Sequence, residues 1–379
     1  MKYLITSIFT LYLLQQHAYA NVDIINIDQP LHNEDQLKIS THGSYRLQAL
    51  LFDEYNEMNE KQKYRRDGYN AASKFYIDAE YKFNDDLALL YGYQAFFNPL
   101  KTLNWQGHYQ NGEQAFTREQ SYLGLSSTTY GTVKYGQIQS LYYDLIGQRL
   151  DLYDYAVIGQ PAAWSSFAHY DGSASTKNTL RYEKKFQSFD VYAAYLLNNH
   201  DTDTQQNFLY QKKQGLSLGL DLRLQPNLSL SSVWHHVDAN LRDKNNHLEK
   251  KFNQEMFGSA LFYNNDRWLI GVGGGWYKNI VPNYLLKESF PQKDIEAYGY
   301  QYYVGYKFNL EHPFLQSIRP YIMGYGATFK KAMHYDRNDY GFGFALKFKY
   351  KFGFDFEHFF TQDSQHTPDV SLFRLRYDW

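Results

Sequence analysis

The side chains that could make or break bonds are poorly spaced for that purpose. None of the 379 residues is a cysteine, which excludes disulfides, thiolate-bound metals and thiol catalysis. The closest approach of a nucleophile to a base is Ser165-Ser166 near His169, and no His-Glu-x-x-His motif occurs. His235 and His236 are adjacent in a predicted strand, so their rings point to opposite faces and cannot share one metal ion. We therefore expect no enzyme activity, no metal site and no cofactor.

A glycine-rich motif at 271–275 also lacks the features of a ligand-binding loop. It has no phosphate-loop lysine and no predicted helix after it, and we interpret it as a bulge or as a strand that another segment approaches closely.

The overall composition narrows the class of protein further. The chain carries 38 basic and 40 acidic residues, a formal charge of −2, which gives no overall field to attract nucleic acid. Its 38 Tyr, 27 Phe and 6 Trp are too many for a disordered chain. The mean hydropathy is −0.62, and no internal run reaches the ~20 apolar residues of a membrane-spanning helix. This combination favours strands that are apolar on one face only.

The first twenty residues have the pattern of a secretory signal peptide. Lys2 precedes an apolar run from Leu4 to Leu14, and Ala18-Tyr19-Ala20 forms a small-x-small cleavage site. We expect residues 1–20 to be removed on export and residues 21–379 to form one domain.

Strict alternation of apolar and polar residues dominates the rest of the chain. At residues 74–83 the odd positions are apolar and the even ones mostly charged, and residues 373–379 alternate in the same way. The pattern predicts sixteen strands, near 38–52, 69–83, 86–97, 117–127, 131–138, 176–186, 190–198, 213–224, 227–237, 253–264, 267–277, 295–308, 318–328, 339–350, 353–362 and 369–379.

The predicted connections alternate between tight turns and long polar loops. Two residues, Asn84-Asp85, join one pair of strands, whereas the next connection runs over 98–116 and a later one over 139–175. Strands of about ten residues with short turns at one end and long loops at the other are typical of a transmembrane β-barrel, which closes because lipid offers no hydrogen-bond partners. A soluble β-sandwich would share the alternation but not the loop asymmetry. We therefore predict an all-β fold, a 16-stranded antiparallel transmembrane β-barrel.

Several segments resemble the trimeric general porins of the Gram-negative outer membrane. The stretch 117–125 followed by 131–136 is similar to a Thr-Arg…Gly-Leu…Gly…Tyr-Gly hairpin of that family, and Tyr143-Asp144 then opens a long third loop, as it does there. Residues 177–182 look like the strand that re-enters the barrel wall. The final strand, 371–379, resembles the C-terminal signal that the barrel-assembly machinery reads, with aromatic or apolar residues at Phe373, Leu375, Tyr377 and Trp379.

In this family the third loop folds inward and its carboxylates face basic residues on the opposite wall. The resemblance implies Asp151 and Asp154 as the acidic side, with Asp144 at the loop entrance. The basic residues that it implies are Lys74, Arg118, Arg46, Lys177 and Arg181. Opposed charges in a low-dielectric constriction focus the electric field and sort ions and dipolar solutes.

The resemblance implies a homotrimeric channel in the outer membrane that passes small hydrophilic solutes by passive diffusion. Two alternatives remain, a solute-specific channel, for example for oligosaccharides, and a closed barrel that acts as an adhesin or structural anchor. Four aromatic residues of the third-loop region could stack on sugar rings or pack the loop against the wall; they are Tyr153, Tyr155, Trp164 and Phe167. A basic cluster at 61–66, in a predicted outer loop, could meet lipopolysaccharide phosphates or simply be solvated.

Overall fold

The computed structural model describes residues 22–26, 36–55, 61–98, 116–153, 159–203, 208–244, 249–282, 294–331, 334–363 and 368–379. The structure describes only the backbone of residues 22–26, 52–55, 61–69 and 203. The predicted signal peptide, residues 1–20, lies outside the described residues.

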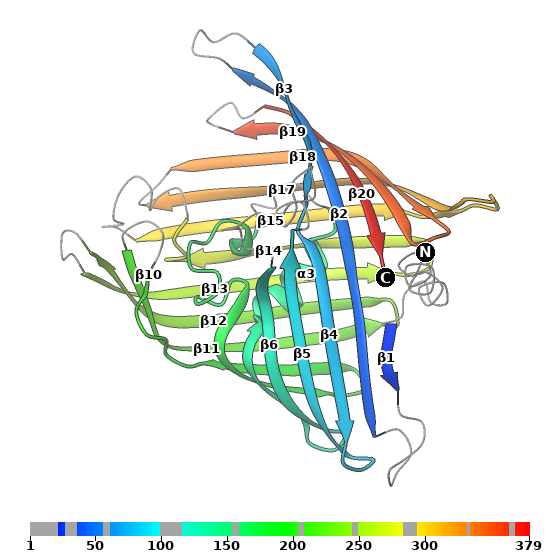
Figure 1. Ribbon diagram of the computed structural model, residues 1–379. Coiled ribbons are helices and arrows are strands. Elements are labelled where there is room, and N and C mark those ends of the chain that lie inside the picture. The colour runs from blue at the N-terminus through cyan, green and yellow to red at the C-terminus, as the bar shows by residue number, and fades with distance from the viewer. Residues whose placement is uncertain are drawn as a thin grey trace, which may run out of the picture.

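The chain forms a closed, 16-stranded antiparallel β-barrel, which confirms the predicted fold. The strands of its wall are β2 (Leu37–Tyr55), β4 (Ser73–Lys82), β5 (Leu87–Phe97), β6 (Phe116–Ser127), β7 (Gly131–Gln139), β8 (Ser175–Lys185), β9 (Phe189–Leu196), β11 (Phe208–Gln225), β12 (Leu228–Asp243), β13 (Glu249–Asn264), β14 (Trp268–Lys278), β15 (Ile295–Tyr306), β17 (Leu315–Lys331), β18 (Tyr335–Phe348), β19 (Phe352–Asp363) and β20 (Val370–Asp378). In Figure 1 the strands β2 to β6 cross the strands β11 to β18 steeply, as expected for tilted strands on opposite walls of a barrel.

The barrel closes between the first long strand and the last. β20 pairs with β2 from Ser44↔Asp378 to Phe52↔Val370, and the backbones of Gly43 and Trp379 exchange two hydrogen bonds of 3.1 Å beyond that ladder. On its other side β2 pairs with β4 and then with β3 (Lys61–Asn70), which continues the line of β4. The remaining short elements are β1 (Val22–Asn26), β10 (Thr202–Asp203) and β16 (Phe308–Asn309).

Several strands extend further than alternation predicts. The basic cluster at 61–66, expected in a loop, lies on β3 and pairs with β2, so the loop prediction was wrong. Likewise β12 and β13 reach into the predicted loop 238–252. In β12 the alternation of buried and partly exposed side chains continues as far as Asp243, with Ala239 and Leu241 buried.

The two faces of the wall differ as a membrane barrel requires. Exposed Leu, Tyr and Val side chains follow one another on the outer face, among them Leu123 and Leu125 on β6, Val133 and Tyr135 on β7, and Leu180 on β8. On these three strands the intervening residues face inward and are mostly polar or glycine, among them Gly124, Lys134 and Arg181. Among the described residues, no helix is long and apolar enough to cross a membrane.

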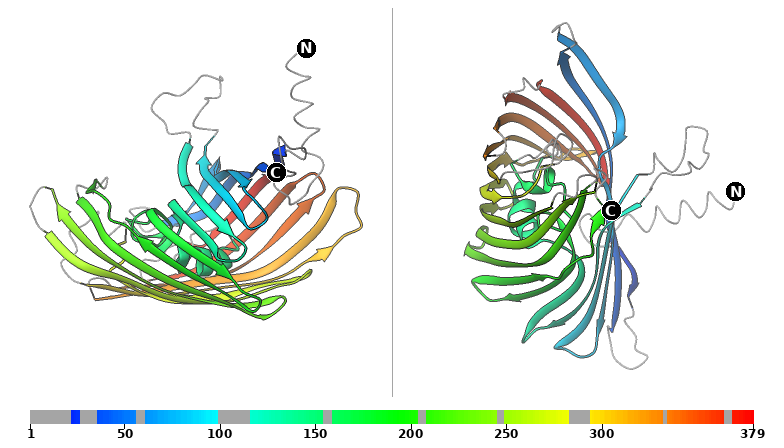
Figure 2. Two further views of the ribbon diagram at one scale, coloured as in Figure 1. Left: turned by 90° about the horizontal axis from the view of Figure 1, so that it is seen from below. Right: turned by 90° about the vertical axis from the view of Figure 1, so that its left-hand side faces the viewer.

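The connection between β7 and β8 folds inward and lies on the inner faces of β12 to β15 (Figures 1 and 2). It contains a helical segment, η1 (Tyr143–Gly147) continued by α3 (Gln148–Leu150), and a short 3₁₀ turn, η2 (Pro161–Ala163). We call residues 140–174 the inner loop. Most of its buried apolar residues join the wall in one cluster, which includes Leu145, Ile146, Leu150, Val233 and Met256, and Tyr153 belongs to a second cluster.

Glycines in the wall allow the inner loop to come close. A Cβ atom on Gly271 would lie 2.5 Å from the carbonyl oxygen of Arg149, and one on Gly275 would overlap the hydroxyl of Tyr142. One on Gly299 of β15 would overlap the carbonyl of Gly159 in the loop. The glycine-rich motif at 271–275 is therefore a site of close approach, as its sequence suggested.

Candidate functional site

The inner loop and the facing wall enclose a polar cavity of about 550 Å³. It is lined by Lys74, Tyr76, Gln94, Phe96, Glu119, Gln120, Gln139, Tyr143, Gln148, Asp151, Ala162, Ala168, His169, Ala174 and Ser175. Strands β4, β5 and β6 form one side of this cavity and the inner loop forms the other, so the cavity lies in the lumen where the loop narrows it.

The acidic side of the cavity contains Asp151, directly after α3. The hydroxyl of Tyr143 donates a hydrogen bond of 2.7 Å to the Asp151 carboxylate. Burial and the neighbouring carboxylate raise the pKa of Tyr143 well above its usual range, so its hydroxyl stays protonated and remains a donor. Asp154, the second predicted acidic residue, lies outside the described residues.

The basic side is built by three adjacent strands. Lys74 of β4 pairs with Ser44 of β2, and two residues further along β2 Arg46 pairs with Arg376 of β20. Lys74 interacts electrostatically with Arg46, Arg374 and Asp151, and its Nζ lies 5.7 Å from the centre of the Phe96 ring. The register thus gathers cationic side chains opposite the loop carboxylate.

Arg374 and Arg376 were not among the residues that the resemblance implied. Alternation already put both on the polar face of the last strand, and closure of the barrel brings that face beside Arg46. Asp355 of β19 balances part of their charge, since its Oδ2 lies 2.8 Å from Arg374 Nη2 and 3.7 Å from Arg376 Nε. The sequence therefore shows that both arginines face the lumen, but their position beside Arg46 follows only from the pairing of β20 with β2.

Arg118 does not face the cavity, contrary to the prediction from alternation. The β5–β6 ladder shifts register here, so that Gln94 pairs with Gln120 but Ala95 pairs with Arg118. Paired residues share a face, so Arg118 is on the face of Ala95, opposite to that of Gln120. Glu119, the residue that the shift leaves over, lines the cavity instead.

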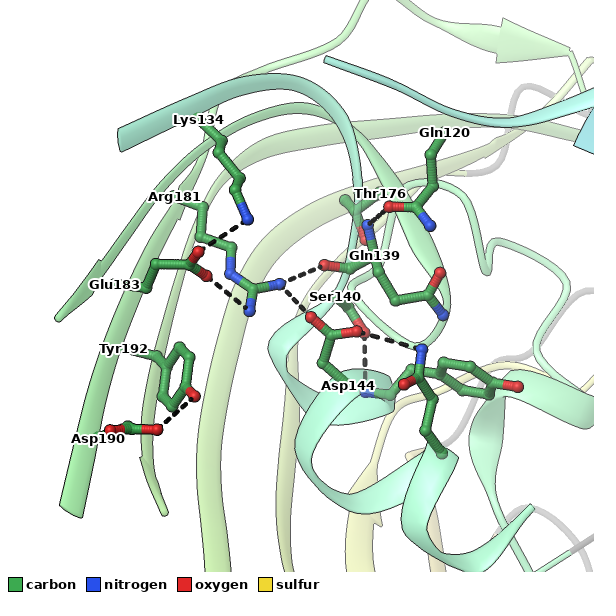
Figure 3. A network of polar contacts seen from close by, with 12 residues as sticks. Gln120, Lys134, Gln139, Ser140, Asp144, Thr176, Arg181, Glu183, Asp190 and Tyr192 are labelled. Atoms are coloured by element: carbon green, nitrogen blue, oxygen red, sulfur yellow. Dashed lines mark hydrogen bonds and ion pairs between the residues drawn. The ribbon is translucent and has the colours of Figure 1, made fainter. Parts of the chain in front are cut away.

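Arg181 reaches the inner loop and forms an ion pair with Asp144 (Figure 3). The same guanidinium group donates to the Gln139 carbonyl at 3.2 Å, and its Nη2 lies 3.3 Å from Oε2 of Glu183. Lys134 Nζ is 2.7 Å from the other oxygen of Glu183. Arg181 therefore holds the start of the loop to β8, with its charge shared between two carboxylates.

Lys177 also contacts the inner loop rather than the cavity. Its Nζ donates a hydrogen bond of 3.0 Å to the hydroxyl of Tyr170 and lies 4.9 Å from the centre of that ring. At the other end of the loop helix, Arg149 Nη2 lies 2.6 Å from Asp221 Oδ2 of β11. Ion pairs thus fix the loop at both sides of its helix.

The aromatic residues of the loop pack against the wall. Tyr153, Trp164 and Phe167 are 1%, 7% and 2% exposed. Phe167 stacks on Tyr210 with ring centres 4.1 Å apart, and Trp164 meets Phe329 edge to face at 5.0 Å. Tyr155 lies outside the described residues. Of the two interpretations open from sequence, the structure favours packing for these three side chains.

Sequence reasoning missed the contact between Ser217 and His235. Residues 215–219 read Gly-Leu-Ser-Leu-Gly, and the hydroxyl of Ser217 lies 2.5 Å from Nδ1 of His235. Ser217 is 2% and His235 1% exposed, and His235 Nε2 is bound to the Asp171 carbonyl at 2.8 Å. With no access to substrate, the pair anchors the inner loop to β11 and β12. Among the described residues no group of three or more possible ligands could hold a metal ion.

The four residues of the predicted assembly signal lie on one face of the closing strand. Phe373 packs on Phe356 with ring centres 5.1 Å apart, and Tyr377 on Phe352 at 5.0 Å. Leu375 is 48% exposed, and the Trp379 ring stacks 6.3 Å from that of Tyr377. This face therefore points out of the barrel.

Comparison with known proteins gives the same architecture. The chain resembles the trimer form of OmpT, an outer membrane protein of Vibrio cholerae, with 13% identity, a TM-score of 0.59 and coverage of 91% of this chain and 100% of that one. It also resembles Salmonella typhi OmpF in complex with daunomycin (12%, TM-score 0.62, 90% and 98% covered). A third similar structure is the anion-selective porin from Comamonas acidovorans (11%, TM-score 0.61, 91% and 100% covered). At these identities the likeness concerns the fold.

No curated protein matches the chain by sequence. A sequence model of the family described as Gram-negative porin matches residues 102–358, which is more than half of the chain. The chain therefore belongs to the Gram-negative porin family and is an outer-membrane channel for passive diffusion.

Proposed function

We propose that this channel is a general porin, which passes small hydrophilic solutes and ions through a constriction between the inner loop and the wall formed by β2, β4 and β20. We call this constriction the eyelet. Asp151 is its acidic side, and Lys74, Arg46 and Arg374 are its basic side.

One observation carries this proposal: a polar cavity of about 550 Å³ has Asp151 on one side and Lys74 on the other. A water molecule occupies about 30 Å³ of liquid, so the space accommodates a small hydrated solute. Charges of opposite sign across a narrow aqueous passage create a transverse field that orients dipoles without binding them tightly.

The lining of the cavity supports a general channel over one specific for sugars. A saccharide site would offer exposed aromatic faces for stacking, whereas Tyr153, Trp164 and Phe167 are buried against the wall. Amide and charged groups line the cavity instead, with Phe96 beneath Lys74 and two tyrosines.

The proposal also covers how the protein is exported, inserted into the outer membrane and assembled. We expect a homotrimer, supported by the fold likeness to an OmpT described as a trimer form. We further expect residues 1–20 to direct export, the face of Phe373, Leu375, Tyr377 and Trp379 to be read by the barrel-assembly machinery, and lipopolysaccharide to surround the outer rim.

Single-channel recording of refolded protein in a planar bilayer, in simple salt, tests the proposal. We expect large, ohmic currents that open in three steps. Current that saturates and is blocked by one solute would instead indicate a solute-specific channel. Absence of current from a folded barrel would refute the channel and favour an adhesin or anchor.

A further inference from the structure

Strand β6 contains one residue more than its partner at the level of the eyelet. Gln94 of β5 pairs with Gln120, and the next residue, Ala95, pairs with Arg118, so Glu119 has no partner in the ladder. This is a β-bulge, which reverses the alternation of side chains on one side of it. In a regular ladder Ala95 would pair with Glu119, and Arg118 would face the lumen. In the bulged ladder Glu119 faces the lumen and Arg118 faces outward.

The carboxylate of Glu119 is held inside the lumen by its neighbours. Ser175 of β8 donates a hydrogen bond of 3.1 Å to its Oε2, and His169 Nδ1 lies 3.0 Å from the same serine hydroxyl. Glu119 also interacts electrostatically with His169, Lys74 and Lys177. It lines the same cavity as Asp151.

Arg118 is outside this environment. Its side chain is exposed and is not part of the cavity lining, and its backbone carbonyl accepts a 3.5 Å hydrogen bond from the Gln137 side chain. One strand therefore presents adjacent charges of opposite sign to opposite faces of the barrel.

We propose that Glu119 is a selectivity-determining residue of this channel and that the bulge in β6 shifts the preference of the eyelet toward cations. The proposal rests on the eyelet of the proposed function. With Glu119 facing inward, the wall adds a carboxylate to that of Asp151; with Arg118 in its place the wall would add a guanidinium to Lys74. At a Debye length of about 8 Å, a negative unit charge about 6 Å away raises the occupancy of a monovalent cation and lowers that of an anion by somewhat less than twofold each, so the cation-to-anion ratio changes roughly threefold.

The test is the reversal potential in a potassium chloride gradient, measured in the full mature channel. Glu119→Gln keeps the acceptor for Ser175 and removes the charge, and we expect it to lower the K⁺/Cl⁻ permeability ratio roughly threefold. The matched control is Arg118→Gln, which removes a charge one residue away on the other face and should leave the ratio unchanged.

A charge-conserving exchange makes the test independent of net charge. Arg118→Glu combined with Glu119→Arg leaves the chain's total charge unaltered but changes the lumen by two units, so the ratio should fall by roughly tenfold. If Glu119→Gln does not assemble, deletion of Glu119 serves as the second variant, because the flanking pairs Gln94↔Gln120 and Ala95↔Arg118 stay aligned without it.

The outcomes separate this inference from the proposed function. An unchanged permeability ratio in a conducting Glu119→Gln channel, or a shift with Arg118→Gln as large as that with Glu119→Gln, overturns the role of the bulge and leaves the porin intact. If the unmodified, folded protein carries no current, the proposed function itself is refuted.

Discussion

Tyr153 attaches the inner loop to the wall through ring contacts and hydrogen bonds. It is 1% exposed, and its ring lies 6.2 Å from that of Tyr325 and 5.7 Å from that of Phe359. Its hydroxyl donates to the Gly324 carbonyl at 3.0 Å and accepts from Gln301 Nε2 at 3.2 Å. Replacing Tyr153 should therefore loosen the loop without opening the barrel, whose ladders do not depend on this side chain.

The size of the effect follows from these contacts. Truncating a buried aromatic side chain to alanine costs about 3–5 kcal/mol, and removing only the hydroxyl costs about 1 kcal/mol. At 1.4 kcal/mol per factor of ten, Tyr153→Ala lowers the ratio of docked to undocked loop by about three orders of magnitude, and Tyr153→Phe by about fivefold.

Single-channel recording can detect this change directly. We expect Tyr153→Ala to raise the mean conductance and the open-channel noise, and Tyr153→Phe to resemble the unmodified channel closely. Tyr130→Ala is the matched control, because Tyr130 is 76% exposed in the turn between β6 and β7. If Tyr153→Ala gives a folded barrel with unaltered conductance and noise, the loop does not depend on this contact and the reasoning is refuted.

Four further predictions concern charge, pH, closure and assembly. Asp151→Asn should shift the reversal potential toward anions by roughly a threefold change in permeability ratio, and an unchanged potential would remove Asp151 from the eyelet. Hydrogen bonds, first from the Thr128 hydroxyl and then from the Thr129 amide, lower the pKa of Asp86 to about 2. Its contribution to the turn is thus present above the ordinary value of 3.8 and is lost as the pH falls through 2, and an NMR titration with an ordinary midpoint would contradict this. Deleting Trp379 should reduce the amount of folded barrel in the outer membrane, whereas normal levels would argue against an assembly signal. Unboiled protein should migrate as a trimer on gels and boiled protein as a monomer, and a monomer under mild conditions would exclude the trimer.

The fold was predictable because lipid imposes a simple rule on the sequence. A wall strand must be apolar outside and is free to be polar inside, so the segment 74–83 shows its strand by alternation alone, and β4 spans Ser73–Lys82. This rule applies only to the part of each strand that lies within the lipid. Strand β3 and the parts of β12 and β13 that pair from Asp238↔Asn253 to Arg242↔Glu249 extend beyond the predicted strands by continued backbone pairing.

The candidate site was predictable as far as regular alternation holds. Lys74 faces the cavity as the alternation of β4 requires, and Arg46 follows the same rule on β2. Arg118 was misplaced because one extra residue in β6 shifts the register, and a bulge has no distinctive composition. The contact between Ser217 and His235 depends on the pairing of two strands, which spacing along the chain does not reveal.

The wall glycines beneath the inner loop affect the width of the pore but carry no charge that would affect its ionic preference. At Gly271, Gly275 and Gly299 the loop rests on bare backbone, and any added methyl group must push it toward the pore axis. The width of the channel thus depends on how closely the inner loop approaches the wall behind it, whereas its ionic preference depends on the charged side chains of the loop and of the opposite wall. A single glycine-to-alanine change at Gly271 would therefore act as a spacer, narrowing the passage for bulky solutes while the order of preference among small ions stays the same.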